Sequence, residues 1–335
     1  MTQLQFKGNT KEYFKIWIVN IFLTIITLGI YSAWAKVRTN RYFYSNTFIG
    51  NDAFEYTADP VKILKGRVLV VLLYLPFVIF SQTIIGAVFL LLLLIMIPWI
   101  VNKAVKFKLK NTKFRNINLR HKLYAGSYYK FFIIHLLLNI VTLYLAFPYT
   151  YHKFKSLILN NSSYGKSDFL YEGKAKRFYL FFGIIVLFMV FVWLGIVLIG
   201  AISTAFNPQT VAIVASIVPF VGIFLIYFLI FVVKGIFDAL TTNYIWENTT
   251  LDNSVKFKAE WKGMKLGWIY FSNLLVMILS LGLLTPWAKI RLAKYKVENF
   301  YIDVEDLDRF IADDTPDETA LGDASEDIFD IDIGI

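Results

Sequence analysis

Long apolar runs alternate with short polar segments along the whole chain. No Lys, Arg, Asp or Glu lies between Arg67 and Lys103, and none lies between Arg177 and Lys234. A helix needs about 20 apolar residues to cross the hydrocarbon core of a bilayer. Each gap therefore has room for two spans, although the first is a tight fit. Three shorter uncharged runs are each long enough for one span, at 16–35, 131–151 and 266–288.

One spacing recurs where five of these segments end. An asparagine lies twelve positions after a residue that is aromatic in four of the five copies. An indole beside basic residues suits the headgroup level of a bilayer, and an Asn side chain bonds local backbone at turns. We therefore interpret both as structural repeat positions. The pairs are Trp34 and Asn46, Trp99 and Asn111, Tyr149 and Asn161, Ile236 and Asn248, and Trp287 and Asn299.

The polar segment after each asparagine contains a turn-forming sequence. Gly50-Asn51-Asp52 is the clearest example, because these residue types tolerate the positive φ of tight turns. Alternating polarity on both sides of such a turn predicts a β-hairpin. We expect hairpins at about 43–57, 107–121, 158–172 and 245–259, and a hairpin-like segment at about 297–311.

These elements group into two blocks, a partial third block and a tail. The predicted fold class is a polytopic α-helical integral membrane protein with internal repeats. Short extramembrane β-hairpins lie between its membrane segments, and a disordered acidic C-terminal tail follows. The blocks are 1–122, with apolar segments of about 16–35, 61–80 and 84–105; 123–260, with segments of about 131–151, 178–202 and 209–236; 261–311, with a segment of about 266–288; and the tail, 312–335.

Two topologies remain open for the three shorter runs. If each run spans, the protein has seven spans, and its first two blocks are inverted repeats of the kind found in transporters. If each run turns back at Gly29, Pro148 or Pro286, all five hairpins lie on one side. All 34 Lys and Arg residues are then cytoplasmic, as the positive-inside rule favours. The run lengths favour spanning, and the charge distribution favours the return.

The net charge of +10 conceals a split between the body of the chain and its end. Residues 1–302 hold 33 basic and 11 acidic side chains, whereas 303–335 hold 13 acidic side chains and one arginine. Basic segments beside membrane helices are attracted to anionic lipid. We therefore expect the bilayer as a partner, with anionic headgroups at a basic cytoplasmic face. Nucleic acid is not expected, because the cations are spread along helix ends.

Polar side chains follow one face of each shorter run. Asn20, Thr24 and Thr27 lie at i, i+4 and i+7. Polar groups in a bilayer are costly unless paired, so this face points into the protein. It either lines a path for a solute or ion, or it forms hydrogen bonds between helices. The counterparts in the other two runs are His135, Asn139 and Thr142, and Asn273 and Ser280.

No catalytic, metal or cofactor site is visible in the sequence. The absence of cysteine excludes disulfides and thiolate chemistry. No histidine pair has metal-binding spacing, and His135 has no acidic partner for a proton relay within its run. Asp238 is expected to pair with Lys234 one helical turn away. We expect neither enzyme activity nor a cofactor or metal.

The segment TLGIYSAWAKVR at 27–38 resembles the YjgN family of bacterial inner-membrane proteins. RYFYSNT at 41–47 and FEY at 54–56 extend the resemblance, and LGLLTPWAKIR at 281–291 is a second copy. The middle counterpart, Pro148-Tyr149-Thr150, lacks the Trp-Ala-Lys core. The resemblance covers roughly 5–311. It implies a multi-pass protein of the bacterial cytoplasmic membrane, and it implies no particular activity.

The leading functional hypothesis is non-enzymatic. In it, the protein binds or translocates a small solute or lipid through a polar interior of its helix bundle. The alternative is a membrane scaffold or sensor that presents its β-hairpins as a cytoplasmic binding module.

Overall fold

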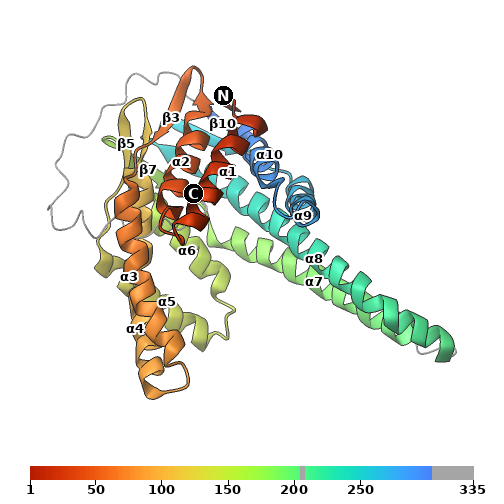
Figure 1. Ribbon diagram of the computed structural model, residues 1–335. Helices are drawn as coiled ribbons and strands as arrows, with labels where there is room; N and C mark the ends of the chain where they lie inside the picture. Colours follow the sequence, from red (N-terminus) through yellow and green to blue (C-terminus); the bar gives the residue numbers. More distant parts are fainter. Residues whose placement is uncertain (204–207, 304–335) are drawn as a thin grey trace.

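The computed structural model describes residues 1–203 and 208–303. Over these residues the chain repeats one unit five times, and each unit is a strand, two helices and a second strand. The ten described strands close into one antiparallel barrel, and the helices extend from one end of it as hairpins (Figure 1).

The units alternate between short and long helical hairpins. In chain order they are β1 (Thr2–Phe6), α1 (Thr10–Ile26), α2 (Ser32–Ser45) and β2 (Thr47–Ile49); β3 (Asp52–Tyr56), α3 (Pro60–Ile79), α4 (Ile84–Lys110) and β4 (Thr112–Phe114); β5 (Ile117–His121), α5 (Ala125–Val141), α6 (Phe147–Leu159) and β6 (Ser162–Tyr164); β7 (Ser167–Tyr171), α7 (Ala175–Ser203), α8 (Pro208–Glu247) and β8 (Thr249–Leu251); and β9 (Val255–Ala259), α9 (Gly263–Leu279), α10 (Thr285–Glu298) and β10 (Phe300–Asp303).

The closed barrel corrects the predicted fold class. A polytopic α-helical protein with separate hairpins between its membrane segments was expected, and the strands instead form one continuous sheet. A lone two-stranded hairpin is marginally stable, and its edges expose unpaired backbone groups. Closure pairs both edges of every hairpin. The first and last strands complete it, with Thr2 opposite Ile302 and Gln3 opposite Tyr301.

The predicted hairpin segments lie at the junctions between units. Tight turns join β2 to β3, β4 to β5, β6 to β7 and β8 to β9, and each turn contains residues with positive φ, such as Gly50 and Asn116. The hairpin-like segment 297–311 contributes the single strand β10 to the described residues. The acidic tail, 312–335, lies outside the described residues.

The inside of the barrel is a packed apolar core. Each strand turns apolar side chains inward, and the charged side chains of β9, Lys256 and Lys258, point outward. A barrel lumen filled in this way is a core and not a channel. The core residues are Leu4, Ile49, Phe114, Ile117, Tyr164, Phe169, Leu251, Val255, Phe257 and Ile302.

The five repeated asparagines have the same geometry. Each Nδ2 donates to the backbone carbonyl four residues earlier, at 2.7–2.8 Å, and so caps the end of the second helix of its unit. Each asparagine carbonyl accepts an N–H from the residue that leaves the unit's first strand, for example from Lys7 to Asn46 at 2.9 Å and from Glu260 to Asn299 at 2.9 Å. The repeat therefore fixes the helix–strand junction.

Removing one of these caps should weaken the fold moderately. An Asn248→Ala variant loses the bond to the Tyr244 carbonyl, and a net contribution of about 1 kcal/mol is typical for such a bond. We expect a lower midpoint of thermal unfolding in detergent. Asn51→Ala, at an exposed barrel turn, is the control. An unchanged midpoint for Asn248→Ala would contradict the capping role.

Each of the three shorter apolar runs is broken into a helical hairpin. α1 ends before Thr27 and α2 begins at Ser32; the same break occurs at Thr142 and at Ser280. Both ends of each hairpin lie at the barrel (Figure 1). This geometry corresponds to the returning topology. In the described residues, three helical segments are long and apolar enough to cross a membrane: Ile84–Lys110, Ala175–Gly195 and Tyr227–Glu247.

Candidate functional site: a cationic pocket between the first and last helical hairpins

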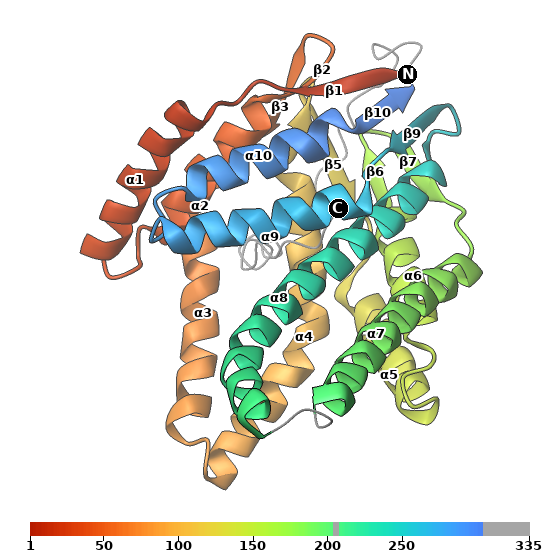
Figure 2. The same ribbon diagram turned by 90° about the vertical axis from the view of Figure 1, so that its right-hand side faces the viewer.

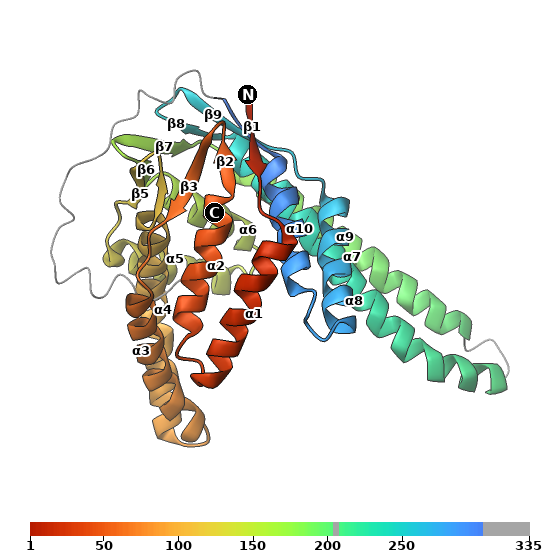
Figure 3. The same cartoon turned by 45° about the horizontal axis from the view of Figure 1, so that its top comes forward.

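Closure of the barrel brings the first and last helical hairpins together. Because β1 and β10 are neighbours, α1 packs against α10 although the helices are far apart in sequence. α2 lies beside α3 on the other side. Figures 2 and 3 show these four helices gathered below the closing strands.

A pocket of about 330 Å³ lies among these four helices. Lys36 of α2, Arg67 of α3 and Lys289 of α10 line it, and none of its lining residues is acidic. Trp17 and Ile25 of α1 contribute to an apolar wall. Pockets of this size hold small ligands, and a few placed polar groups select them. This pocket suits an anion that carries an apolar portion.

Two copies of one motif supply the pocket. Trp34-Ala35-Lys36 begins the return helix of the first hairpin, and Trp287-Ala288-Lys289 begins that of the last. Lys36 and Lys289 occupy the same repeat position and converge on one pocket. The middle copy, at Tyr149, lies in α6, outside the lining. The third cation, Arg67, donates to the Ser32 hydroxyl at the start of α2.

Asn20 lines the pocket, and its side-chain oxygen is buried without a hydrogen-bond partner among the described residues. Its Nδ2 donates to the Ala35 carbonyl at 3.3 Å, as Asn273 does to Ala288 at 2.9 Å in the last hairpin. The Asn273 Oδ1 accepts from the Arg291 guanidinium at 3.1 Å.

In the first hairpin the equivalent arginine has a different hydrogen-bond partner. Arg38, the counterpart of Arg291, donates to the Tyr31 hydroxyl at 3.3 Å. The buried Asn20 Oδ1 and the buried Tyr13 hydroxyl have no hydrogen-bond partner among the described residues. A buried polar atom without a partner is uncommon in a folded protein. Both residues line the pocket, but these two atoms are themselves buried, and the equivalent Asn139 Oδ1 of the middle hairpin also has no partner among the described residues.

Other members of the polar stripe form hydrogen bonds within their own helical hairpins. The Thr24 hydroxyl donates to the Asn20 carbonyl at 2.6 Å. Asn139 Nδ2 donates to the Thr150 hydroxyl at 3.0 Å, and His135 Nδ1 lies 2.9 Å from the Phe131 carbonyl. Among the stripe residues, Asn20 and Thr24 line the pocket, and the remainder of the stripe lies elsewhere.

The last polar residue of each stripe stabilises the turn between the two helices of its hairpin. The hydroxyls of Thr27, Thr142 and Ser280 accept the backbone N–H four residues later, from Tyr31, Ala146 and Leu284, at 2.9–3.1 Å. These bonds favour the hydrogen-bonding interpretation for this part of the stripe.

The repeated aromatic residues flank the basic residues of the return helices. Trp34 stacks on Tyr31, with ring centroids 6.1 Å apart. The Arg291 guanidinium lies 5.1 Å from the Trp287 ring, and the Lys153 ammonium lies 5.6 Å from the Tyr149 ring. All four aromatic residues are half-buried, and Trp99 differs from the others because it lies in the middle of α4 and not in the first turn of a helix. Attraction between a cation and an aromatic face fixes these side chains on their helices.

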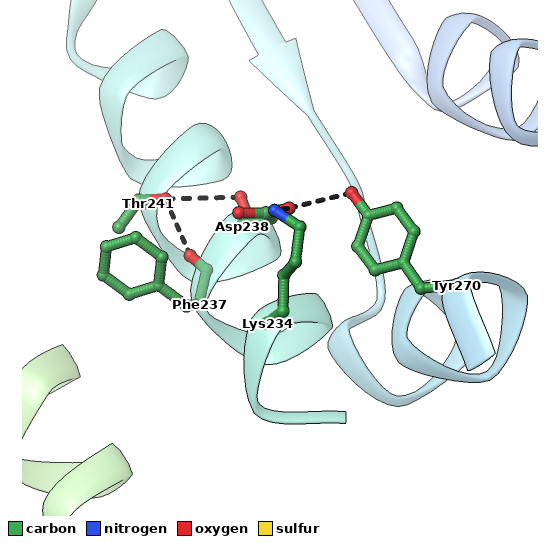
Figure 4. A network of polar contacts seen from close by, with 5 residues as sticks. All are labelled: Lys234, Phe237, Asp238, Thr241 and Tyr270. Atoms are coloured by element: carbon green, nitrogen blue, oxygen red, sulfur yellow. Dashed lines mark hydrogen bonds and ion pairs between the residues drawn. The ribbon is translucent and has the colours of Figure 1, made fainter. Parts of the chain in front are cut away.

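A second polar cluster joins α8 to α9 (Figure 4). Lys234 and Asp238 form an ion pair at 2.9 Å, which confirms the pairing expected from their spacing. The Tyr270 hydroxyl of α9 donates to the Asp238 carboxylate at 2.8 Å. The Thr241 hydroxyl donates to the Phe237 carbonyl at 2.7 Å. The acid is already matched by a cation and a phenol, so the cluster stabilises the contact between the two helices.

The histidines do not gather. His121 ends β5, His135 lies in α5 and His152 lies in α6. Among the described residues no group of three or more His, Asp or Glu side chains is arranged to hold a metal ion.

Two features of the pocket were not predicted from the sequence. Arg67 marked only the boundary of an uncharged gap in the sequence, and no sequence pattern indicated Tyr13.

The sequence also contains a repeated tyrosine that the sequence analysis did not use. It lies four residues before the repeated asparagine in three copies, at Tyr42, Tyr244 and Tyr295. Each of these hydroxyls accepts the N–H of the residue that leads into its unit's helices, at 2.7–2.8 Å.

Comparison with known proteins places the chain among bacterial membrane proteins. The model of the DUF898 family, described as a bacterial protein of unknown function, matches residues 1–328. The inner membrane protein YjgN of Salmonella typhimurium is 24% identical over 344 residues, which cover 88% of this chain and 87% of that protein. The Escherichia coli K12 protein of the same name is 32% identical over 120 residues, which cover 33% of this chain and 29% of that protein. No solved structure matches the chain significantly.

Proposed function

Because this chain belongs to the YjgN family of inner-membrane proteins, we propose that it binds an anionic phosphate ester in the pocket between α1, α2, α3 and α10. The ligand is either the headgroup of an anionic phospholipid or a free phosphate ester of the same chemistry. The predicted inner-membrane location is confirmed by the relatives, and it makes lipid the more abundant source.

The observation that carries the proposal is the convergence of Lys36, Arg67 and Lys289 on one pocket. Three cations without a lining acid favour an ester with one or two negative charges. The apolar wall at Trp17 and Ile25 would contact the first part of an acyl chain.

Binding, rather than catalysis or passage through the barrel, is the activity that we propose. The barrel interior is filled by its apolar core, so a ligand in the pocket has no open path through it. The cations also fit a basic cytoplasmic face, because the positive-inside rule favours a barrel on the cytoplasmic side.

The test compares lipid binding by two variants with the same loss of charge. The pocket variant carries Lys36→Gln, Arg67→Gln and Lys289→Gln. The control carries Lys166→Gln, Lys174→Gln and Lys256→Gln, which are exposed and outside the pocket. Binding of phosphatidylglycerol in nanodiscs should weaken at least about tenfold in the pocket variant, a cost of about 1.4 kcal/mol. It should change little in the control.

A soluble arm separates the two sources of the ligand. Calorimetry with glycerol phosphate should give binding to the wild type if a free ester suffices, and none if the acyl chains are required. Equal affinity of pocket and control variants in both arms would contradict the proposal. The scaffold or sensor alternative, with a partner at the turn end of the barrel, would then be preferred.

A further inference from the structure

A second pocket, of about 470 Å³, lies at the barrel end of the long hairpin that α7 and α8 form. Figure 1 shows the two helices leaving the barrel side by side. Unlike the pocket of three cations, this one is lined by one basic and one acidic side chain, Arg177 and Glu247. Phe181 and Leu240 contribute an apolar wall. Complementarity of charge gives a site its specificity, so this pocket suits a ligand with both charges and an apolar portion.

The uncharged polar side chains of the second pocket already form hydrogen bonds within the protein. Asn243 Nδ2 donates to the Trp261 carbonyl at 2.9 Å, and its Oδ1 accepts the Trp261 N–H at 3.0 Å. Asn248 Nδ2 donates to the Tyr244 carbonyl at 2.8 Å. The Tyr244 hydroxyl accepts the Lys174 N–H at 2.7 Å and donates to the Lys174 carbonyl at 3.4 Å. These groups shape the pocket, and the choice of ligand is left to the two charges.

The two charged side chains are available to a ligand. Both are exposed, and neither the Arg177 guanidinium nor the Glu247 carboxylate forms a hydrogen bond or an ion pair with another described residue. Lys258 interacts electrostatically with Glu247, but its ammonium pairs with Glu260 at 2.6 Å. A guanidinium binds a phosphate through two parallel hydrogen bonds, and a carboxylate accepts strong hydrogen bonds from an ammonium. One ligand that carries a phosphate and an ammonium would therefore match both groups.

The order of the groups along the helices gives the ligand a direction. Leu240 packs against the apolar cluster that contains Phe181, so these two residues form one wall. Arg177 lies four residues from Phe181 towards the barrel, or about 6 Å along α7. Glu247 lies seven residues from Leu240 towards the barrel, or about 10 Å along α8. From the apolar wall outwards, the cation comes first and the carboxylate second. A phospholipid with an ethanolamine headgroup has the matching order of acyl chain, phosphate and ammonium.

The second pocket also lies where α7 changes from charged to apolar. Arg177 is the last charged residue before the uncharged run that ends at Lys234. Tyr179 and Leu180, which follow it, are exposed apolar side chains, and Ala175–Gly195 is long and apolar enough to cross a membrane. Arginine near the end of such a helix places its charge at the interface. The two charges of the pocket are thus at the level of lipid headgroups.

We propose that the second pocket binds phosphatidylethanolamine, with the lipid phosphate at Arg177 and the lipid ammonium at Glu247. The protein then holds a zwitterionic lipid here, in addition to the anionic ester at the pocket of Lys36, Arg67 and Lys289. The two sites share no lining residue, so each can bind without the other. A choline headgroup carries three methyl groups in place of the ammonium protons, so it cannot donate to Glu247 and should bind more weakly.

The first experiment measures binding of dioleoyl phosphatidylethanolamine to the purified protein by native mass spectrometry. Arg177→Gln and Glu247→Gln should each weaken binding about tenfold, the usual effect of losing one hydrogen bond to a charged group. The matched controls are Lys176→Gln and Glu172→Gln, which remove an exposed cation and an exposed acid outside the pocket. They should bind like the wild type. An equal loss in pocket and control variants would overturn the proposal.

The second experiment tests the direction of the ligand. Arg177→Glu combined with Glu247→Arg keeps both charges but places the acid nearer the apolar wall, so binding should stay as weak as in the single variants. Wild-type affinity in this exchanged variant would contradict the proposed orientation.

The third experiment compares headgroups. Wild-type protein should bind dioleoyl phosphatidylcholine about tenfold more weakly than the ethanolamine lipid, and Glu247→Gln should remove this difference. Equal affinity of the wild type for the two lipids would overturn the proposal. The variant with Lys36→Gln, Arg67→Gln and Lys289→Gln should bind the ethanolamine lipid normally, so failure here is distinguishable from failure of phosphate-ester binding at the other pocket.

Discussion

A Gly235→Ala variant is expected to lose about 3 kcal/mol of stability, at the upper end of the usual cost of overpacking. Gly235 of α8 lies against Gly267 of α9, and an added Cβ would lie 2.2 Å from the Gly267 nitrogen and 2.5 Å from its Cα. These contacts are with backbone, which cannot rotate away as a side chain can. The two helices must therefore separate, and the packing on both sides of the contact is lost.

The close approach of α8 and α9 depends on small residues from both helices. Gly263 and Gly267 are four residues apart on α9, the spacing that lets membrane helices pack closely. A Cβ on Gly263 would lie 2.7 Å from the Ile236 Cα. Polar contacts reinforce the same contact, because Tyr270 of α9 bonds to Asp238 of α8.

The measurement is the midpoint of thermal unfolding in detergent. Gly183→Ala in α7 is the matched control, because a Cβ there meets no atom within 4 Å and alanine favours a helix more than glycine does. The midpoint should fall clearly for Gly235→Ala and should stay or rise slightly for Gly183→Ala. Equal midpoints in the two variants would show that the helices are not held at this distance.

Acid should destabilise the protein through His121. Burial lowers the pKa of this imidazole to about 3, and the charge of Lys106 acts in the same direction. The Ser162 hydroxyl donates to the Ile158 carbonyl, so it accepts from His121 Nδ1 at 3.3 Å, while Tyr128 bonds to Nε2 at 2.9 Å. Both ring nitrogens of the neutral form are thereby used, and an added proton has no acceptor in place.

The sign of the pH effect follows from the two pKa values. Unfolded His121 takes up a proton as the pH falls below about 6.5, its ordinary pKa, whereas the folded form remains neutral down to about pH 3. The unfolded state therefore binds more protons in this window, and stability falls with the pH. The loss from His121 is about 1.4 kcal/mol per pH unit, or up to about 5 kcal/mol over the whole window. Burial also lowers the pKa of His152, which adds to the slope.

A His121→Gln variant should show a flatter decline of stability between about pH 6.5 and pH 4, because glutamine does not titrate. Chemical unfolding in detergent at several pH values measures the slope. Tyr128→Phe is the control: it removes one bond to His121 but keeps the imidazole, so the steep slope should persist. If His121→Gln and wild type decline in parallel, His121 is not the group responsible.

The contrast between predicted and observed architecture lies in the strands. The turn at Gly50 and the asparagine at position 46 locate a hairpin, because their chemistry acts over a few residues. The sequence of a single hairpin does not indicate which other strand pairs with its edge. The pairing of β1 with β10 joins residues about 300 positions apart, and only the returning path of all five helical hairpins places these strands side by side.

The pocket shows the same limit. The polar stripe identified Asn20 and Thr24, and the resemblance identified the two Trp-Ala-Lys copies, but neither indicated that Lys36 and Lys289 line the same space. The two equivalent asparagines also differ in a way that the sequence does not show: Arg291 donates to the Asn273 side-chain oxygen, whereas Arg38 donates to Tyr31 and the Asn20 side-chain oxygen has no partner among the described residues.

By itself the sequence determined the membrane environment, the five-fold repeat, the capping asparagines and the family. Each of these follows from the length of an uncharged run or from the spacing of residues within one short segment. The tertiary structure decided the closed barrel, the returning short hairpins and the cationic pocket. The barrel and the pocket depend on strand edges and helix faces that contact residues far away in the sequence. The short hairpins depend on hydrogen bonds within their turns, which the pattern of apolar residues does not reveal.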